Sequence, residues 1–295
     1  MRKIRVGSRG SKLALWQTDY VINELKKKNQ DIKFEKIIIK TKGDKILDTA
    51  LSKVGDKGLF TKELELSLLN NEIDIAVHSM KDVPTNIDDN LIISCVLKRE
   101  KTEDVFISNK YKSFNDLKPK SIVGTSSLRR KAFLQNKRND IIYTDIRGNL
   151  DTRLRKLDEG QYDAIILAYA GIHRLGLDNR IREFISIEDI TPAVGQGAIG
   201  IQTRKNDIFV NDIVKLINDE ITFKCVSIER FLLNKIEGGC QIPFGCYSYL
   251  SDNKIFVKFD LFNDNKKVSI FESFSRELSY VEIGNIIYNK FKAMI

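Results

Sequence analysis

Short apolar runs alternate with amphipathic stretches along the first part of the chain. Residues 4–6 are typical of a β-strand and lead into a Gly/Ser/Arg loop at residues 7–11. The next stretch has apolar side chains at helical spacing, at Leu13, Trp16, Val21 and Leu25. Residues 34–39 and 73–77 are two further apolar strands. Strands that alternate with helices predict an α/β fold with largely parallel pairing.

The same succession of elements returns in the middle of the chain. Each copy contains a strand, a Gly/Ser/Arg loop and a helix, then a second strand with its loop, and then a helix end with a buried strand. The matched pairs are residues 4–11 with 121–130, 34–44 with 141–151, and 71–77 with 160–166. Three matched units in one order predict two α/β lobes of similar topology.

The loops richest in Gly, Ser and Arg all follow predicted strands. A parallel sheet binds its ligands beyond the carboxyl ends of its strands. We therefore expect functional residues in these loops, and two lobes that face each other across a cleft. The loops are residues 7–11, 42–44, 78–84, 124–130 and 147–153.

The last part of the chain has a different pattern. A helix that begins near Glu220 is followed by strands expected at residues 255–259 and 268–272, around a turn at residues 263–266. Residues 280–291 have the spacing of a closing amphipathic helix. This predicts a small α+β domain.

A loop of this domain contains Cys240, in the run EGGCQIPFG at residues 237–245. Structural cysteines usually sit in apolar runs, whereas these glycines and the proline mark an exposed turn. A thiol there is accessible, and a basic neighbour would favour its thiolate. On this segment alone, an ordinary exposed loop cysteine explains the pattern equally well.

The composition is that of a globular protein, with 42% hydrophobic and 30% charged residues among 295. No apolar run is long enough to span a bilayer, and the first residues do not form a signal peptide, so we expect a cytoplasmic protein. The four cysteines have no CxxC spacing and there are only two histidines, which argues against a zinc site.

The formal net charge of +9 makes nucleic acid a possible partner. However, the aromatic residues do not interleave with the basic ones as a stacking platform requires. The arginines instead concentrate in the predicted loops. We therefore expect neither a nucleic-acid nor a membrane partner.

The cysteine segment resembles a known signature. With Glu229, Arg230 and Ile236 before it, the run Gly238-Gly239-Cys240-Gln241-Ile242-Pro243 is similar to the cofactor-attachment signature of the porphobilinogen deaminase (hydroxymethylbilane synthase) family. The resemblance continues through at least five other motifs between Val6 and Gly245. The last fifty residues show little of this resemblance.

The resemblance implies a fold: two lobes like those of periplasmic binding proteins, and a small C-terminal domain. The first lobe would hold residues 1–97 with 198–215, the second residues 103–191, and the C-terminal domain residues 220–295. Hinges would lie at residues 98–102 and 192–197.

The resemblance also implies an activity. The family joins four porphobilinogen molecules head to tail, with release of ammonia, to give hydroxymethylbilane. The chain grows on a dipyrromethane primer attached to the cysteine, here Cys240. This primer is built from the substrate, so no metal, nucleotide or flavin is implied. Members are mostly monomers.

The motif HSMKDVP at residues 78–84 contains Asp82. Judged alone, an aspartate before Val-Pro is more often a turn former. The resemblance makes Asp82 the catalytic carboxylate, because loss of ammonia leaves a cationic azafulvene that a nearby anion stabilises.

Arginines suit the substrate, since each porphobilinogen carries an acetate and a propionate, and guanidinium binds carboxylates bidentately. Surface salt bridges are the alternative role for these arginines. The resemblance implies cofactor-binding residues besides Cys240, namely Lys81, Asp82, Thr125, Ser127, Arg129, Arg130, Arg147 and Gly148. The implied substrate-binding residues are Arg9, Ser11, Phe60, Arg153, Arg174 and Gln196, with Lys53 and Lys57 on a mobile lid.

One departure from the family pattern is Gln202, where the family often has glutamate. A rival hypothesis from another class is a two-lobed anion-binding or effector-sensing module without catalysis. Such a module has no use for an accessible cysteine.

Overall fold

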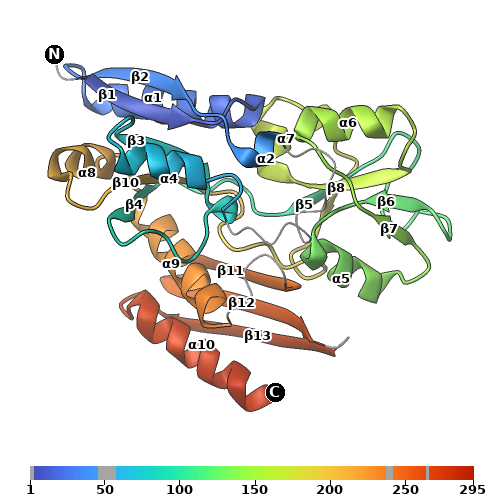
Figure 1. Ribbon diagram of the computed structural model, residues 1–295. Helices are drawn as coiled ribbons and strands as arrows, with labels where there is room; N and C mark the ends of the chain where they lie inside the picture. The colour runs from blue at the N-terminus through green and yellow to red at the C-terminus, as the bar shows by residue number, and fades with distance from the viewer. Residues whose placement is uncertain (1–2, 46–57, 237–241, 264–265) are drawn as a thin grey trace. The chain divides into compact units, whose positions relative to one another are not determined.

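The computed structural model describes residues 3–45, 58–236, 242–263 and 266–295 (Figure 1). These residues form two compact units. The first unit contains residues 3–45, 58–100 and 197–224. The second contains residues 101–196 together with the described residues from 225 to 295.

The first unit is built on a mixed five-stranded sheet in the order β2-β1-β3-β10-β4. Its elements are β1 (Lys3–Ser8), α1 (Lys12–Lys28), β2 (Lys33–Ile38), α2 (Lys42–Lys45), α4 (Lys62–Leu69), β3 (Ile75–Ser79), the 3-10 helix η1 (Met80–Asp82), β4 (Leu91–Val96), β10 (Ile199–Arg204) and α8 (Ile208–Lys215). Helix α9 (Glu220–Lys235) starts in this unit and continues into the second.

The second unit contains a sheet in the order β7-β6-β8-β5-β9. Its elements are β5 (Asp104–Ile107), β6 (Ile122–Gly124), α5 (Leu128–Lys137), β7 (Ile142–Thr144), α6 (Leu150–Asp158), β8 (Ala164–Ala168), α7 (Tyr169–Arg174), the 3-10 helix η2 (Asp178–Arg180) and β9 (Glu183–Ile185).

The two sheets have the same topology, which confirms the predicted pair of similar lobes. Each sheet contains three neighbouring parallel strands, β2-β1-β3 in the first and β7-β6-β8 in the second. In both, the middle strand of the three, β1 or β6, comes before the other two along the chain. The prediction of largely parallel pairing is wrong for the other half of each sheet. Strand β10 runs antiparallel to both β3 and β4, and β5 runs antiparallel to both β8 and β9. Neither β10 nor β5 is preceded by a crossover helix, which a parallel neighbour requires.

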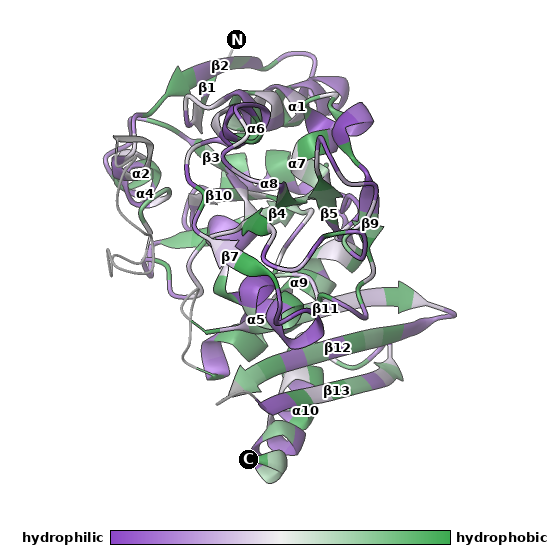
Figure 2. Ribbon diagram, turned by 90° about the vertical axis from the view of Figure 1, so that its right-hand side faces the viewer, coloured by the Kyte–Doolittle hydropathy of each residue, from purple (hydrophilic) through white to green (hydrophobic). Residues whose placement is uncertain are grey.

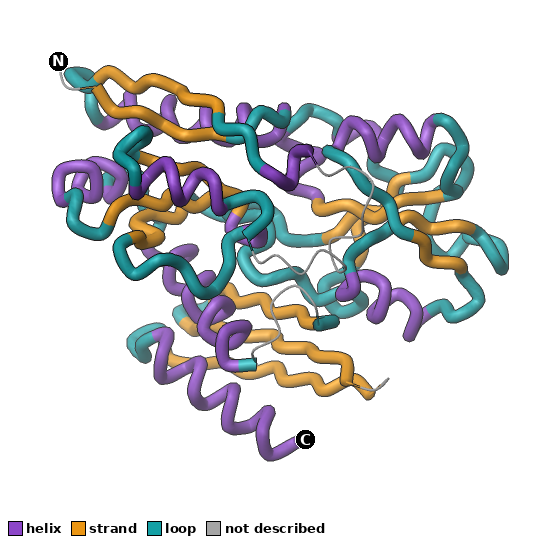
Figure 3. Tube along the Cα trace, viewed as in Figure 1, coloured by secondary structure: helices purple, strands orange, loops and turns teal. Residues whose placement is uncertain are grey.

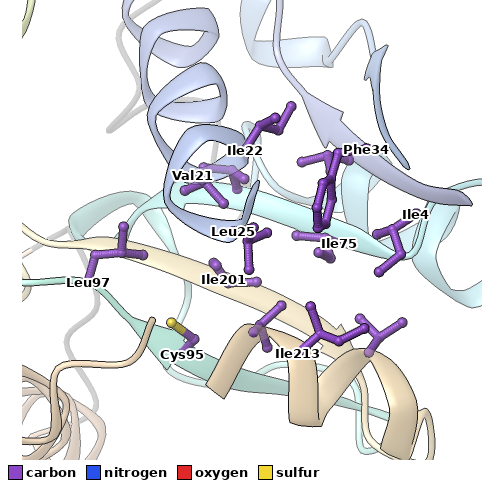
Figure 4. Close-up of a cluster of buried hydrophobic side chains, with 14 of the residues drawn as sticks. Ile4, Val21, Ile22, Leu25, Phe34, Ile75, Cys95, Leu97, Ile201 and Ile213 are labelled. Carbon is purple, nitrogen blue, oxygen red and sulfur yellow. The ribbon is translucent and has the colours of Figure 1, made fainter. Parts of the chain in front are cut away.

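Helices cover both faces of the first sheet, because its central strands are apolar on both sides. Figure 4 shows one face, where α1 places Val21, Ile22 and Leu25 against Ile75 and Ile201 of the sheet. Helix α8 packs on the same face. On the opposite face, α4 packs through Leu64 and Leu68.

The second sheet is covered in the same way. Helix α5 packs Phe133 and Leu134 on one face. Helices α6 and α7 cover the other face through Leu154, Leu157 and Ile172. Strand residues of β5 and β8 alternate between these two clusters, which fixes their register.

The C-terminal region is a three-stranded antiparallel sheet, in the order β11-β12-β13, with a closing helix (Figure 3). Its elements are β11 (Phe244–Ser251), β12 (Lys254–Asn263), β13 (Lys266–Ser275) and α10 (Tyr280–Met294). Hydrophobic and hydrophilic residues interchange along β12, as Figure 2 shows. This confirms the predicted α+β domain.

Strand β11 was not expected from the sequence. Its eight residues, FGCYSYLS, include one glycine, two serines and two tyrosines, so its apolar pattern is weak. It forms because it pairs with β12 along its whole length, from Phe244 opposite Leu261 to Ser251 opposite Lys254. The first strand after the Cys240 segment is therefore part of the domain's core.

The three described cysteines, Cys95, Cys225 and Cys246, are buried in these cores as free thiols. Burial raises the pKa of the Cys95 thiol to about 12, and a buried thiol does not reach an alkylating reagent. We therefore expect iodoacetamide at pH 8 to leave all three unmodified in the native protein. Peptide mass spectrometry would check this, with the denatured protein as the control that labels every free thiol. A labelled Cys95 in native protein would contradict the packing described above.

Candidate active site

Polar side chains gather at one edge of the first sheet. Parallel strands β1 and β3 end there, at Ser8 and Ser79. The antiparallel strand β10 begins at the same edge, because Ile199 pairs with Ser79. Two sets of predicted residues therefore follow the same edge: Arg9 and Ser11 after β1, and Lys81 and Asp82 after β3.

Asp82 lies in the short helix η1, directly after β3. The turn is anchored by Met80, which is 1% exposed and whose N–H donates to the Ala198 carbonyl at 3.0 Å. Val83, also buried, donates to the Met80 carbonyl at 3.3 Å. Because its neighbours on both sides are anchored, the Asp82 carboxylate is held at the surface in a defined place.

Met80 packs against Gly200 of β10. A Cβ added to Gly200 would lie 2.0 Å from the Met80 Sδ atom and 3.0 Å from its Cγ. Met80 can therefore pack closely against β10 only because residue 200 has no side chain. Sequence reasoning missed this contact, since nothing near Asp82 along the chain points to residue 200.

His78 precedes this turn and is buried in a polar chain. Its Nε2 lies 3.0 Å from the Gln202 Oε1, and the Gln202 Nε2 donates to a Glu65 carboxylate oxygen at 2.9 Å. Because the amide nitrogen already donates to Glu65, the amide oxygen accepts from His78. A glutamate at position 202 would instead face the Glu65 carboxylate, so the amide suits this neighbour.

The structure brings Arg9 and Phe60 together. The Arg9 guanidinium carbon lies 4.1 Å from the centre of the Phe60 ring, which is a cation–π contact. Ser11 has a different local role, because its hydroxyl caps α1 by accepting the Ala14 N–H at 3.4 Å.

The second sheet repeats this arrangement. Parallel strands β6, β7 and β8 end at one edge, and β5 begins there, since Asp104 pairs with Ala168. The loop after β6 carries Thr125 and Ser127, the loop after β7 carries Arg147 and Gly148, and α7 after β8 carries Arg174.

Arg129 and Arg130, in the first turn of α5, are both buried, at 5% and 6% exposure. Each donates an Nη2 hydrogen bond of 2.7 Å to Asp104, one to each carboxylate oxygen. These pairs are buried, so the alternative of surface salt bridges is wrong for them. Asp104 was missed by the sequence analysis; its only signal is a carboxylate at the start of the apolar run DVFI.

Gln196 joins the same group. Its Nε2 donates to an Asp104 oxygen at 2.9 Å and to the Thr102 carbonyl at 2.6 Å. The side chain is 1% exposed. Asp104, which was not predicted, thus accepts hydrogen bonds from three predicted residues. Two are the cofactor-binding arginines and the third is the substrate-binding Gln196.

The hydroxyl groups of the loop after β6 shape the loop itself. Ser127 caps α5 by accepting the Arg130 N–H at 3.4 Å, and its own N–H donates to the Thr125 hydroxyl at 3.3 Å. In the loop after β7, Gly148 has a φ of 107° and its carbonyl accepts from the Arg153 Nε at 2.9 Å. A side chain at Gly148 would be strained.

Several guanidinium nitrogens are buried without a hydrogen-bond partner among the described residues. They are the Nε of Arg129, the Nε of Arg130, and the Nε and Nη2 of Arg147. Buried polar groups are normally satisfied, and a guanidinium has no acceptor atom to turn inward. These donors are therefore suited to an anion such as a carboxylate. Arg174, at the end of α7, is also buried.

Three predicted site residues, Lys53, Lys57 and Cys240, lie outside the described residues. Within the described ranges, no helix is both long and apolar enough to cross a membrane. The same ranges contain no group of three or more His, Cys, Asp or Glu side chains arranged to hold a metal ion.

Two family models match the chain. "Porphobilinogen deaminase, dipyromethane cofactor binding domain" covers residues 4–212, and "Porphobilinogen deaminase, C-terminal domain" covers residues 223–293. The chain belongs to the porphobilinogen deaminase family.

Curated porphobilinogen deaminases agree with this over most of their length. The protein of Carboxydothermus hydrogenoformans is 49% identical over 87% of this chain and 83% of its own. That of Desulforamulus reducens is 45% identical over 99% of this chain and 95% of its own. Among solved structures, a putative methionine-binding lipoprotein from Bacillus subtilis matches with a TM-score of 0.47 and 13% identity, over 81% of this chain and 96% of that one.

Membership of the porphobilinogen deaminase family makes the chain a transferase, a hydroxymethylbilane synthase. It condenses porphobilinogen head to tail on a dipyrromethane cofactor. This decides against the rival hypothesis of a binding module without catalysis. The buried guanidinium donors fit the cofactor and substrate of a porphobilinogen deaminase, since the pyrroles of both carry carboxylates.

Replacement of Gly200 by alanine tests how the Asp82 turn is held. The new Cβ would collide with Met80, so we expect the free energy of unfolding to fall by about 1–3 kcal/mol. Turnover of porphobilinogen should fall with it, because the Met80 side chain that anchors η1 must move. Chemical denaturation and a porphobilinogen consumption assay would measure both.

The stability control is Gly10→Ala, whose Cβ would have its nearest neighbour at 3.7 Å, the Ile38 Cγ2. Its free energy of unfolding should stay close to that of the wild type. Unchanged stability and turnover in Gly200→Ala would show that Met80 does not hold the turn.

Proposed function

We propose that Asp82 is the catalytic carboxylate of this hydroxymethylbilane synthase. The observation that carries the proposal is the exposed carboxylate on an anchored turn, at the carboxyl edge of the first sheet. When the C–N bond of porphobilinogen breaks, ammonia leaves and the remaining azafulvene is a cation. A fixed carboxylate stabilises that cation. It can also accept the proton that is lost from the attacked pyrrole carbon once the new C–C bond has formed.

Dipyrromethane, when bound, supplies the pyrrole position to which the first substrate is joined. The residues proposed to hold it are Arg129, Arg130 and Arg147, with Lys81, Thr125, Ser127 and Gly148. Burial of Arg129 and Arg130, and of the Nε and Nη2 atoms of Arg147, supports this role, because a guanidinium away from water binds a carboxylate more strongly than one at the surface.

The substrate's own carboxylates are proposed to bind Arg9, Arg153 and Arg174, with contributions from Ser11, Phe60 and Gln196. The Arg9–Phe60 contact supports a joint role for this pair. The face of the aromatic ring contacts the guanidinium and so restricts its position.

Attachment of the cofactor at Cys240, and lid roles for Lys53 and Lys57, rest on the sequence motifs. The proposed domains are residues 1–97 with 198–215, residues 103–191 and residues 220–295. A cytoplasmic, monomeric enzyme without nucleic-acid or membrane partners also stays a prediction. The proposed use of the arginines accounts for part of the positive charge without nucleic acid.

Asp82→Asn is the direct test of the catalytic proposal. Asparagine keeps the shape and a hydrogen-bond acceptor but removes the charge, so we expect turnover of porphobilinogen to fall about hundredfold or more. Because the side chain is exposed, the free energy of unfolding should change by less than about 0.5 kcal/mol. The matched control is Asp89→Asn, an exposed aspartate of the following loop, which should keep wild-type turnover. Near wild-type turnover in Asp82→Asn would remove Asp82 from the mechanism.

Cys240→Ala tests the attachment site. The intact mass of wild-type protein under denaturing conditions should exceed the sequence mass by two linked pyrroles, and the variant should have the sequence mass. If the wild type is unmodified as isolated, incubation with porphobilinogen should add the excess to it and not to the variant. A mass excess that persists in Cys240→Ala would place the attachment on another residue.

A further inference from the structure

Asp104 is the centre of a buried charge cluster. Its Oδ1 accepts from the Arg130 Nη2 at 2.7 Å and from the Gln196 Nε2 at 2.9 Å, and its Oδ2 accepts from the Arg129 Nη2 at 2.7 Å. The Asp104 side chain is fully buried. Both carboxylate oxygens are therefore committed to three side chains that come from two distant segments of the sequence.

Each arginine of the cluster is also fixed by a backbone carbonyl. Arg129 donates from Nη1 to the Thr191 carbonyl at 2.7 Å, and Arg130 donates from Nη1 to the Ile166 carbonyl at 3.0 Å. Two hydrogen bonds per guanidinium, one to Asp104 and one to the backbone, fix the plane of each group. In both cases the Nε is left buried and without a hydrogen-bond partner among the described residues.

The charges of the cluster do not balance. Two guanidiniums face one carboxylate, and within the described parts of the chain no other acidic side chain forms an ion pair with either arginine. One positive charge is thus buried without compensation, which is costly in a medium of low dielectric constant. An anion of single charge that reaches the two Nε donors would remove this cost.

The ionisation of the cluster agrees with this description. Burial favours the neutral acid, but the attraction and hydrogen bonds of Arg129 and Arg130 outweigh it and hold the pKa of Asp104 well below its usual range. Burial and the neighbouring Arg130 lower the pKa of Arg129, although Asp104 opposes them. The two arginines therefore stabilise the charged form of Asp104.

We propose that Asp104 is a positioning residue of the cofactor site. It orders Arg129 and Arg130 and neutralises one of their two charges, so that the pair binds one carboxylate of dipyrromethane. This rests on the proposed roles of the two arginines. Asp104 itself does not touch the cofactor in this proposal; it acts through the arginines.

The test is cofactor loading of the apoprotein, measured by intact mass during incubation with porphobilinogen. In Asp104→Asn the amide keeps the shape of the side chain, but it cannot accept from both arginines and Gln196. The two guanidiniums then repel each other and leave their positions. We expect loading to be slower by about tenfold or more, because misplacement of a binding group by even 1 Å has effects of this size.

Asp74→Asn is a matched control. Asp74 also accepts from two arginines, with its Oδ1 2.8 Å from the Nη2 of both Arg5 and Arg204, but it lies before β3, at the opposite end of that strand from Asp82. Its loss should lower the melting temperature and leave the loading rate at the wild-type value. Loading of Asp104→Asn at the rate of Asp74→Asn would overturn the proposal.

Two further measurements keep the proposal testable if Asp104→Asn does not fold. Asp104→Glu keeps the charge but displaces the carboxylate by one methylene, so a positioning role predicts slow loading, and wild-type loading would overturn it. The second is the rise in melting temperature on loading, which reports how tightly the cofactor is held. The rise in melting temperature should be smaller in Asp104→Glu than in Asp74→Asn. An equal rise would show that Asp104 has only a structural role.

The wild-type arm separates this proposal from the proposed function. If the wild-type apoprotein gains no mass from porphobilinogen, the proposed function fails whatever Asp104 does. If it gains the mass and Asp104→Asn gains it equally fast, only the role of Asp104 fails.

Discussion

In both units, one antiparallel strand begins where three parallel strands end, and the functional loops depend on this placement. In the first sheet, β10 supplies the Ala198 carbonyl and the space at Gly200 that seat the turn of Asp82. In the second, β5 supplies Asp104, which holds Arg129 and Arg130. A parallel strand at the same place would present its opposite end to the loops. The reversed strand is therefore what lets a distant segment of the chain hold the residues of each edge.

The two edges use this support for opposite kinds of chemistry. The Asp82 carboxylate is exposed, and only the backbone on either side of it is anchored, so that it can meet a cation that forms during the reaction. The arginine pair is buried and held through its own side chains, which suits a ligand that stays bound. A buried charge needs partners that are present all the time. One sheet topology therefore supports both the proposed reacting group and the proposed cofactor-binding pair.

The sequence was sufficient for features that depend on neighbouring residues. The strand and helix patterns, the repeated order of elements and most loops after the strands are local, and the structure has them within a few residues of where they were expected. Residues 42–44 are an exception, because they were expected as a loop and lie in helix α2. Asp104, the packing of Met80 on Gly200 and the strand β11 depend on pairing with distant segments, so no local pattern reveals them. Arg129 and Arg130 show the same limit, because their residue type predicted an anion site but not that each would donate both to Asp104 and to a backbone carbonyl.

A second cluster shows why the charge of the Asp104 group matters. At the start of β3, Asp74 pairs with Arg5 and Arg204, and Arg204 also pairs with Asp207 at 2.9 Å. Two arginines there face two carboxylates, so this cluster is neutral without a ligand. The Asp104 cluster also has two arginines around one carboxylate, but it has no second acidic side chain among the described residues. Because burial penalises an uncompensated charge, the protein's own side chains balance the first cluster, whereas the carboxylate of the proposed ligand would balance the second.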